Sequence, residues 1–304
     1  MEVYMKRILL LLFIFCLFVM AVQLAVHLWL STSAPQYAVF DTRQFEVIAH
    51  QGGGGVSPPN TLTAMRAALA AGADVLEMDI RLSRDGQIVV IHDQTLDRTT
   101  SCKGKVRDRT LAELRGCDKG FHFKSGKAFP FRNLGIEIPT LKDVFRSFPG
   151  QRMIIEIKHA EPSLVPEFCQ MIRSFDMQEH LVIGSFRQKP MDDFRKTCPE
   201  VATSATLKEA TLFVLTDKMG LSGIISPVYT ALQILPLLKI SSMPFLPEFN
   251  IVTPSLVEQA HAKGIVVQVW TVNEARQMKS LFAMGVDGIM TDYPARLVDA
   301  IPER

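Results

Sequence analysis

Two carboxylates and a histidine lie close together in one short stretch of this sequence. Glu77 and Asp79 are two residues apart in an apolar run typical of a strand, so their side chains share one face of it. Unpartnered carboxylates in apolar surroundings are unfavourable, so the pair indicates a chemical role. A turn at Asp85-Gly86 leads to a second strand, which ends at His92. The stretch predicts part of a metal-assisted acid/base site on a β-hairpin.

The rest of the chain alternates short apolar strands with helices, which predicts parallel strands joined by helical crossovers. A turn of a few residues cannot join neighbouring parallel strands. One arm of the hairpin is therefore expected to be an addition to an eight-stranded barrel. The predicted strands besides the hairpin arms are 46–50, 152–158, 181–186, 201–206, 223–228, 265–272 and 286–292, and the main predicted helices are 62–71, 140–148, 163–175, 190–196, 254–263 and 274–284.

The predicted fold class is an α/β TIM (β/α)8 barrel with a β-hairpin excursion, preceded by one N-terminal transmembrane helix. About 260 residues suit such a barrel, and polar side chains follow several strands at their carboxyl ends, where barrel enzymes hold their active sites. An open doubly wound sheet is the alternative. Residues 94–139 are long for a connection and predict a functional loop with short helices, such as 111–115.

The N-terminal segment from Ile8 to Leu30 is long and apolar enough to predict a membrane-spanning helix. Lys6 and Arg7 precede it, which places the N-terminus in the cytoplasm and the main domain outside, in the periplasm if the source is bacterial. A cleaved signal peptide is the alternative, but its apolar core is usually shorter. The expected organisation is an anchor at 1–30, a tether at 31–44 and a catalytic barrel domain at 45–304.

Composition gives no argument for a nucleic-acid partner and does not settle whether the cysteines are paired. The chain has 33 basic and 31 acidic residues, so overall charge offers no argument for nucleic-acid binding. The five cysteines lack metal-ligand spacing. If the domain is extracytoplasmic, a Cys102–Cys117 disulfide is one option, although unpaired cysteines are the favoured interpretation.

Six motifs in register resemble those of the glycerophosphodiester phosphodiesterase family. Each is weak alone, but together they run in order through almost all of the chain after the N-terminal segment. The family is a TIM barrel related to phosphatidylinositol-specific phospholipase C. The motifs here are His50-Gln-Gly-Gly with Pro58-Pro-Asn-Thr61, Leu76-Glu-Met-Asp79 with Asp85-Gly86, His92-Asp93, Glu156-Ile-Lys158, Trp270-Thr-Val-Asn273 and Thr291-Asp-Tyr-Pro294.

The resemblance implies hydrolysis of glycerophosphodiesters to glycerol 3-phosphate and an alcohol, through a cyclic phosphate. It implies that His50 and His92 are the general acid and base. Oxygen ligands and an anionic substrate also fit a hard cation, and histidine suits proton transfer near neutral pH. The remaining implied roles are metal binding by Glu77, Asp79 and Glu156, with Ca²⁺ or Mg²⁺ as the ion, and substrate binding by Gln51, Lys158 and Trp270.

Two positions depart from the family's usual pattern. The family mostly has arginine after the first histidine, where this chain has Gln51, and mostly glutamate before Asn-Thr, where it has Pro59. Gln51 brings no charge, so the metal and Lys158 are expected to carry more of the phosphate. These changes bear on substrate preference more than on catalysis.

Three functions compete at this point. The first is hydrolysis of soluble glycerophosphodiesters. The second is a phospholipase C or lysophospholipase D acting on membrane phospholipids or lysophospholipids, with the N-terminal helix holding the domain at the membrane. For that function, the four phenylalanines of residues 121–131 are the predicted apolar entrance. The third is a non-catalytic ligand-binding relative.

Overall fold

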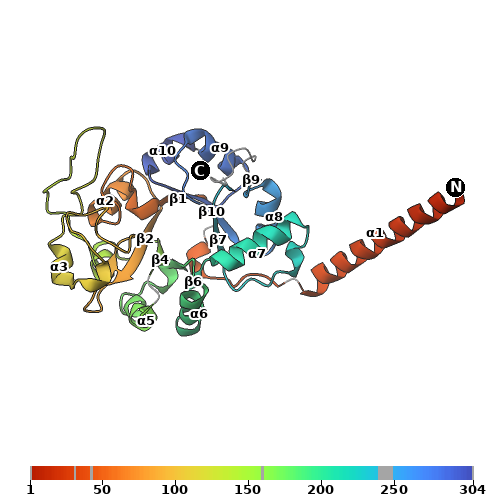
Figure 1. Cartoon of the computed structure of the whole chain (residues 1–304), viewed down its shortest axis with the longest axis horizontal. Helices are drawn as coiled ribbons and strands as arrows, with labels where there is room; N and C mark the ends of the chain where they lie inside the picture. The colour runs from red at the N-terminus through yellow and green to blue at the C-terminus, as the bar shows by residue number, and fades with distance from the viewer. Residues whose placement is uncertain (1, 31, 42–43, 159–160, 239–248, 303–304) are drawn as a thin grey trace.

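The computed structural model describes residues 2–30, 32–41, 44–158, 161–238 and 249–302 of the 304-residue chain. Helices surround a barrel of parallel strands, and α1 extends away from it (Figure 1). The strands are β1 Glu46–Ala49, β2 Val75–Leu82, β3 Ile88–Val90, β4 Met153–Ile157, β5 Leu181–Gly184, β6 Ala202–Thr203, β7 Ala231–Ile234, β8 Leu237–Leu238, β9 Phe249–Asn250, β10 Val266–Val269 and β11 Gly288–Thr291. The α-helices are α1 Glu2–Leu30, α2 Leu62–Ala70, α3 Leu111–Arg115, α4 Leu141–Ser147, α5 Val165–Ser174, α6 Gln188–Thr197, α7 Leu207–Lys218, α8 Pro254–Ala262, α9 Ala275–Ala283 and α10 Pro294–Ala300. Five short 3₁₀ turns join them: η1 Ala38–Phe40, η2 His50–Gly52, η3 Val106–Asp108, η4 Gln178–His180 and η5 Ser222–Ile224.

Eight parallel strands form the barrel in the order β6-β5-β4-β2-β1-β11-β10-β7. β6 and β7 meet through a parallel bridge between Ser204 and Ala231, so the two ends of the sheet join. The Thr230 amide donates to the Thr203 carbonyl at 2.9 Å, which extends this contact. The predicted barrel is confirmed, and the open doubly wound sheet is excluded.

The hairpin excursion is also confirmed. β3 pairs antiparallel with β2, with Ile80 opposite Val90, and lies outside the eight barrel strands. At the turn, Gly86 has a φ of +75°, which glycine adopts without a steric penalty. The Ile91 amide then donates to the Asp79 carbonyl at 2.9 Å. This hydrogen bond places His92 beside the carboxyl end of β2.

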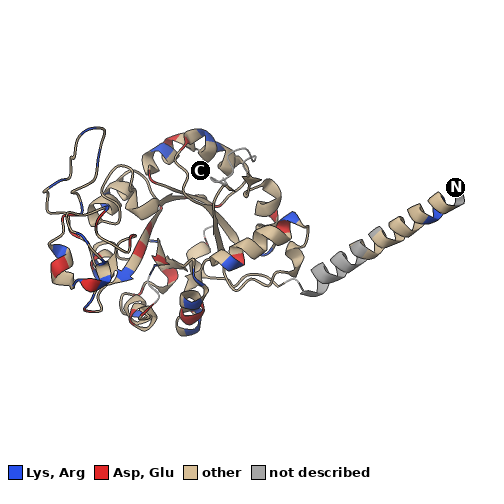
Figure 2. Ribbon diagram, in the orientation of Figure 1, with Lys and Arg blue, Asp and Glu red and all other residues tan. Residues whose placement is uncertain are grey.

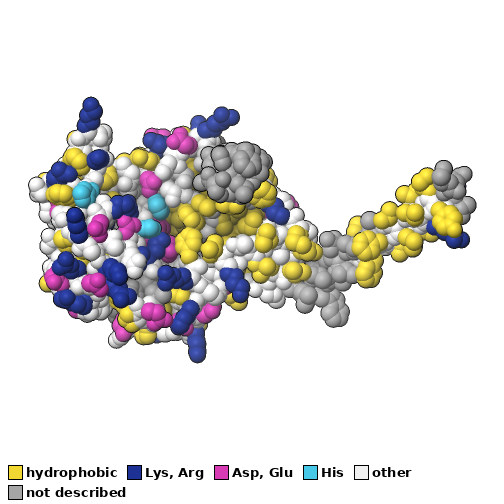
Figure 3. Space-filling model, in the orientation of Figure 1, with side chains coloured by type: hydrophobic (Ala, Val, Ile, Leu, Met, Phe, Trp, Pro, Cys, Tyr) yellow, Lys and Arg dark blue, Asp and Glu magenta, His cyan; other side chains and the backbone are white. Residues whose placement is uncertain are grey.

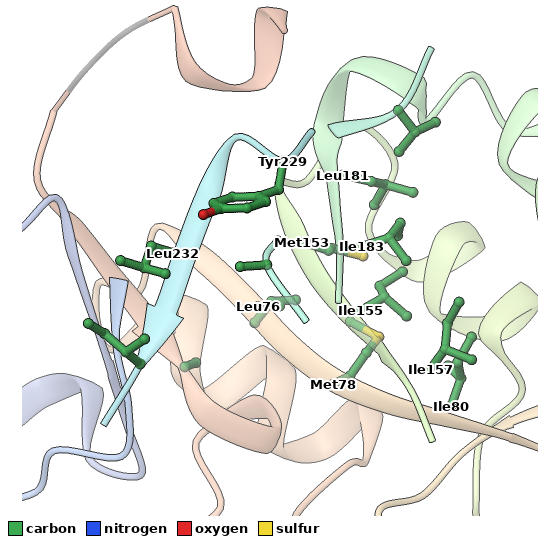
Figure 4. Packing of buried hydrophobic residues seen from close by; sticks show 14 of the residues in the cluster. Leu76, Met78, Ile80, Met153, Ile155, Ile157, Leu181, Ile183, Tyr229 and Leu232 are labelled. Atoms are coloured by element: carbon green, nitrogen blue, oxygen red, sulfur yellow. The ribbon is translucent and has the colours of Figure 1, made fainter. Parts of the chain in front are cut away.

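Side-chain alternation along the strands separates two apolar layers. In Figure 4, Leu76, Met78 and Ile80 of β2 lie in the same cluster as the matching residues of β4 and β5. The side chains between them point the other way, into the barrel, where Val75 packs in a second cluster that includes Ile154. Glu77 and Asp79 share the face of Val75, so this alternation directs both carboxylates into the barrel.

The seventh barrel strand lies later in the chain than predicted. Residues 223–228 do not form a strand, and β7 is Ala231–Ile234. Pro227 interrupts the apolar run, since it lacks the amide proton that a central strand needs. Helix α7 was not predicted. Thr206 and Glu209 form a reciprocal capping box at its start, so the helix begins directly after β6.

The N-terminal segment is helical, but its predicted membrane span is not confirmed. Among the residues that the structure describes, no helix is both long enough and apolar enough to cross a membrane. The side chains of residues 21–30, within the predicted span, lie outside those described. Part of the predicted tether packs on the barrel, where Val39 is buried and its carbonyl accepts from Arg152 at 2.6 Å.

The cysteine interpretation is corrected by two disulfides. Cys102 bonds to Cys117 with Cα atoms 5.5 Å apart, and Cys169 bonds to Cys198 with Cα atoms 5.9 Å apart. Four of the five cysteines are therefore paired. The second bridge joins a residue of α5 to the residue that ends α6. The packing of these two helices brings the cysteines together, and the spacing of cysteines in the sequence does not show it.

Replacing Cys102 and Cys117 together by serine is expected to lower the free energy of unfolding by about 3 kcal/mol. The bridge spans 15 residues and restricts the unfolded chain accordingly. The Cys169 and Cys198 pair spans 29 residues, so its removal is expected to have a slightly larger effect. Urea unfolding of the oxidised proteins measures both changes, and unchanged midpoints would contradict this expectation.

Candidate active site

One cavity of about 610 Å³ opens among the carboxyl ends of the barrel strands. Its lining combines titratable residues with a wall of apolar side chains. Charged and polar groups therefore meet an apolar surface within a single space. All eight predicted site residues line it: His50, Gln51, Glu77, Asp79, His92, Glu156, Lys158 and Trp270.

Three carboxylates and one ammonium form the charged part of this cavity. Asp79 and Glu156 are register partners on neighbouring strands β2 and β4. Lys158 lies between them, with Nζ 2.7 Å from Glu156 Oε2 and 3.4 Å from Asp79 Oδ1. Glu77 accepts a hydrogen bond of 2.7 Å from the Gln51 amide. One ammonium thus faces three buried or half-buried carboxylates, which leaves an excess of negative charge.

The pKa directions reflect this crowding. Burial raises the pKa of Glu77, and the neighbouring Asp79 charge raises it further. Burial also raises the pKa of Glu156 to about 7, although Lys158 opposes the shift. For Lys158, burial lowers the pKa, but Asp79 and Glu156 outweigh it and the net shift is upward. The site therefore favours an additional positive charge among its carboxylates.

His50 is held by a chain of hydrogen bonds from the last barrel strands. Its Nδ1 lies 2.7 Å from Asp292 Oδ1, just after β11. Asn273 donates from Nδ2 to Asp292 Oδ2 at 2.7 Å, and its Oδ1 accepts from the Asp292 amide at 2.9 Å. Burial lowers the pKa of His50, but the Asp292 hydrogen bond and the charge of Glu77 outweigh it and raise it to about 9. Asp292 thus fixes the ring and favours its protonated form.

His92 has a comparable but more exposed arrangement. Its Nδ1 lies 2.8 Å from Asp93 Oδ1, and Arg98 donates to both oxygens of Asp93 at 2.6 and 2.9 Å. Burial raises the pKa of Asp93, but the Arg98 and His92 hydrogen bonds prevail and lower it to about 2. Arg81 holds the His92 carbonyl from two nitrogens, at 2.9 and 2.7 Å. Each histidine therefore lines the cavity and has a carboxylate at Nδ1.

The glycine-rich stretch after His50 is an ordered packing loop. The amides of Gly53 and Gly54 donate to the His50 carbonyl at 2.9 and 3.1 Å, and that of Gly55 to the Asp292 carbonyl at 3.1 Å. A Cβ on Gly55 would lie 2.6 Å from the ring of Tyr293, so only glycine fits there. These three amides are therefore engaged within the fold.

Asn60 has a role that the sequence did not assign. Thr61 caps α2, accepting from the Ala64 amide at 3.1 Å. Asn60 instead turns to β2, donating from Nδ2 to Asp79 Oδ2 at 2.9 Å and accepting from the Asp79 amide at 3.1 Å. Its φ of +59° fits asparagine, one of the residue types that tolerate this region. Asn60 therefore orients Asp79.

The apolar wall of the cavity comes from α7 and the strands after it. Trp270 contacts Phe186 edge to face, with ring centroids 5.5 Å apart, at the border with the charged part. Beyond it the lining is Leu207, Ala210, Val214, Leu215, Leu235, Leu238, Phe249 and Ile251. The phenylalanines of residues 121–131 are absent from the lining, and all four pack around Arg132 or against one another instead. The predicted position of the apolar entrance was therefore wrong.

The sequence matches the glycerophosphoryl diester phosphodiesterase family over residues 50–296. A glycerophosphodiester phosphodiesterase of Caldanaerobacter subterraneus is 33% identical over 263 residues, which cover 84% of this chain and 97% of the relative. The chain belongs to the glycerophosphoryl diester phosphodiesterase family. The predicted enzyme class, a phosphoric diester hydrolase acting on glycerophosphodiesters, is thereby confirmed.

Two further relatives are informative. Human lysophospholipase D GDPD1 is 26% identical over 266 residues, which cover 83% of this chain and 84% of the relative. An Oleispira antarctica phosphodiesterase, solved with the product sn-glycerol-3-phosphate, superposes with a TM-score of 0.68 at 25% identity, over 88% of this chain and all of the other. The barrel of this glycerophosphoryl diester phosphodiesterase is thus shared with solved family members.

The two departures from the family pattern flank the glycine loop in the sequence. The Gln51 side chain lines the cavity, and its backbone, at a φ of +50°, holds Glu77. Pro59 packs against Gly54, where an added Cβ would lie 3.0 Å away. Pro59 therefore acts through the shape of the loop, while Gln51 remains in reach of a ligand.

The donor chemistry of this phosphodiesterase suits a hard divalent cation. Glu77, Asp79 and Glu156 offer carboxylate oxygens on one wall of the cavity, and such ligands prefer Ca²⁺ or Mg²⁺. Across the described part of the chain, no three His, Cys, Asp or Glu side chains form a ready metal cluster. Lys158 takes the cationic position next to Asp79 and Glu156 instead. The residues fit the ion by donor type and by their excess negative charge.

Replacing Asp292 by asparagine is expected to lower kcat by roughly 10²-fold with little change in KM. The substitution keeps the size of the side chain but removes the charge that orients His50 and stabilises its protonated form. Steady-state kinetics on glycerophosphocholine measure the effect. Asp287→Asn is the matched control. Asp287 Oδ2 lies 2.7 Å from His261 Nε2, and neither residue lines the cavity. Equal losses in both variants would contradict a positioning role for Asp292.

Proposed function

We propose that this enzyme hydrolyses glycerophosphodiesters with the help of a divalent cation and two histidines. The observation that carries this proposal is the convergence of His50, His92 and three carboxylates on one cavity. Glu77, Asp79 and Glu156 would hold the ion, with Ca²⁺ or Mg²⁺ as candidates. When bound, the ion supplies positive charge beside the phosphate oxygens of the substrate.

The residues of the chain then divide the proton transfers. One histidine takes the proton of the glycerol hydroxyl that attacks phosphorus, and the other protonates the oxygen of the departing alcohol. A new phosphorus–oxygen bond closes a cyclic phosphate as the bond to the alcohol breaks. With the proton roles reversed, water opens the ring to glycerol 3-phosphate. Lys158 and Gln51 bind phosphate oxygens, and Trp270 borders the substrate cleft.

The test is release of glycerol 3-phosphate from glycerophosphocholine, glycerophosphoethanolamine and glycerophosphoglycerol, with EDTA and with each divalent ion restored. We expect turnover that EDTA suppresses by at least about 10²-fold and that Ca²⁺ or Mg²⁺ restores. Full activity in EDTA would contradict the metal, and no turnover on any diester with either ion would contradict this function.

A single-chain phospholipid is the favoured substrate within this class. The charged site continues directly into the apolar wall of α7, where Val214 is half-buried and Leu207 is 58% exposed. A soluble head-group diester offers nothing apolar to such a wall. An acyl chain would gain about 0.8 kcal/mol for each buried methylene group. A human family member named as a lysophospholipase D is consistent with this choice.

Comparing a short-chain lysophosphatidylcholine, kept below its micelle concentration, with glycerophosphocholine tests this choice. We expect the lipid to have at least a tenfold higher kcat/KM. Val214→Gln, which places an amide in the apolar wall, should reduce that ratio by about tenfold. Thr110→Ala, in the loop before α3 and outside the cavity lining, is the control. Equal kcat/KM for both substrates would favour the soluble diester.

The domain is proposed to lie outside the cytoplasm, in the periplasm if the source is bacterial. Lys6 and Arg7 precede the apolar N-terminal segment, which supports an anchor with its N-terminus inside. The two disulfides add support, because such bonds persist mainly in oxidising compartments. Protease digestion of intact and permeabilised cells tests this placement. A domain that resists protease until the inner membrane is opened would contradict it.

A further inference from the structure

The surface beside the active-site mouth is unusually apolar for a solvent-facing region. Figure 3 shows apolar side chains gathered next to the histidines and over α7. On α7 the exposed fractions are 50% for Leu212 and 56% for Leu215, and Met219, directly after the helix, is 66% exposed. Across the mouth, Phe249 is 54% and Leu238 45% exposed. Contiguous exposed apolar patches of this kind mark interaction surfaces.

The pattern of α7 explains this surface. Ala210, Phe213 and Thr216 turn inward and are buried, as on any barrel helix. A second apolar face lines the cavity, and the outer strip of Leu212 and Met219 continues it towards solvent. Between its two charged ends, the helix carries no charge at all (Figure 2). A helix exposed on one side normally carries polar residues there, so this outer strip calls for a partner.

Location decides which partner fits. The apolar surface borders the cavity that holds the catalytic groups, so a protein covering it would obstruct the substrate's entry. A lipid surface would instead present the substrate. The N-terminal helix α1 reaches the fold at η5, directly after α7, and leaves the barrel on this side (Figure 1). The side chains described in α1 beyond Arg7 are apolar and exposed.

The charges around the surface agree with a lipid surface. Lys208 and Lys218 lie at the two ends of α7 and are exposed, and Lys218 lies 5.8 Å from the centre of the Phe249 ring. Asp217 is the nearest opposing charge, 3.9 Å from Lys218. Apolar side chains flanked by lysines are typical of surfaces that lie in the interface of a membrane.

We propose that the outer strip of α7, with Phe249 and Leu238 across the mouth, docks on the membrane surface so that the cavity opens directly to lipid. This inference rests on the proposed phosphodiesterase activity for its kinetic test only. Docking in this orientation places the apolar wall of the cavity next to the acyl chains of the leaflet. A single-chain phospholipid can then enter without passing through water.

The test compares full-length wild type with a Leu212→Gln/Met219→Gln variant, reconstituted in phosphatidylcholine–phosphatidylglycerol vesicles. Neither residue lines the cavity. We expect at least a tenfold lower kcat/KM on lysophosphatidylcholine in the vesicles, with hydrolysis of soluble glycerophosphocholine unchanged within twofold. Leu134→Gln is the matched control, because Leu134 is 65% exposed in the loop before α4 and lies outside the cavity lining.

Hydrogen exchange provides a readout that does not require activity. Amides of residues 207–219 should exchange several times more slowly in vesicles than in the same protein kept in solution by an amphipathic polymer. The variant should lose this protection. The proposal would be overturned if the variant hydrolysed lysophosphatidylcholine in vesicles as fast as wild type. It would also be overturned if the amide protection appeared only when mass photometry detected dimers. If soluble glycerophosphocholine is not hydrolysed at all, the proposed function fails, while the exchange result still decides on docking.

Discussion

Replacing either His50 or His92 by alanine is expected to lower kcat on glycerophosphodiesters by roughly 10²- to 10⁴-fold, with the fold intact. This range is typical for loss of a general acid or base. Each histidine is held by a carboxylate at Nδ1 and lines the same cavity. Because both rings are fixed in place, neither is expected to take over the proton transfer of the other. If the two act in one proton relay, as proposed, the double variant should be little slower than the worse single variant.

His122→Ala is the control for this prediction. His122 is exposed in the loop before α4, where it contacts Phe121 with ring centroids 4.9 Å apart, and it lies outside the cavity lining. Its removal should leave kcat within twofold of wild type. Circular dichroism and thermal melting would verify that all variants fold. Retention of most activity by His50→Ala or His92→Ala would contradict the assignment of the acid and base.

The hairpin that carries Glu77, Asp79 and His92 could be predicted from sequence because its determinants are local. Two-residue spacing directs Glu77 and Asp79 to one face, and the turn at Asp85-Gly86 returns the chain beside it. The rule that parallel neighbours need a long crossover identified one arm as an addition to the barrel. Strand register then brought Glu156 opposite Asp79, which spacing alone could not specify.

The residues that sequence reasoning left undecided are those that act over long distances in the chain. Asp292 meets His50 across 242 positions, and Asn60 meets Asp79 across 19. Pairings of this kind follow from barrel closure and from loop conformation, neither of which has a local signal. A capping asparagine and an asparagine that holds a carboxylate look the same in a single sequence.

The misplaced seventh strand had a different cause. Both 223–228 and 231–234 are short apolar runs, and periodicity alone does not identify the secondary structure of such runs. Overlooking α7 in turn hid the apolar wall of the cavity. The capping box at Thr206 and Glu209 was the available signal for that helix.

Replacing Glu77 by glutamine is expected to raise the melting temperature in the presence of EDTA while greatly reducing activity. Glu77 lies 5% exposed among carboxylates, and burial together with the Asp79 charge raises its pKa to about 8. Glutamine can still accept the Gln51 amide hydrogen bond but removes the repulsion. A gain of about 1 kcal/mol would raise the melting temperature by roughly 2–4 °C. Such a result would show that the negative charge is unfavourable for the fold, as expected of a carboxylate kept for the proposed cation.

Glu46→Gln makes the comparison decisive, since Glu46 is also 5% exposed but lies at the opposite end of the barrel. It pairs with Arg152 and accepts from Gln268 at 2.7 Å, and burial raises its pKa although Arg152 opposes the shift. Glu46→Gln therefore also removes a buried carboxylate, but one that lies outside the cavity lining. Saturating Ca²⁺ or Mg²⁺ should raise the melting temperature of wild type and of Glu46→Gln, because a ligand that binds only the folded state stabilises it. Glu77→Gln should lose most of this response. If the ions stabilise Glu77→Gln as much as wild type, the carboxylates at the carboxyl ends of β2 and β4 are not the metal site, and their mutual repulsion has another purpose.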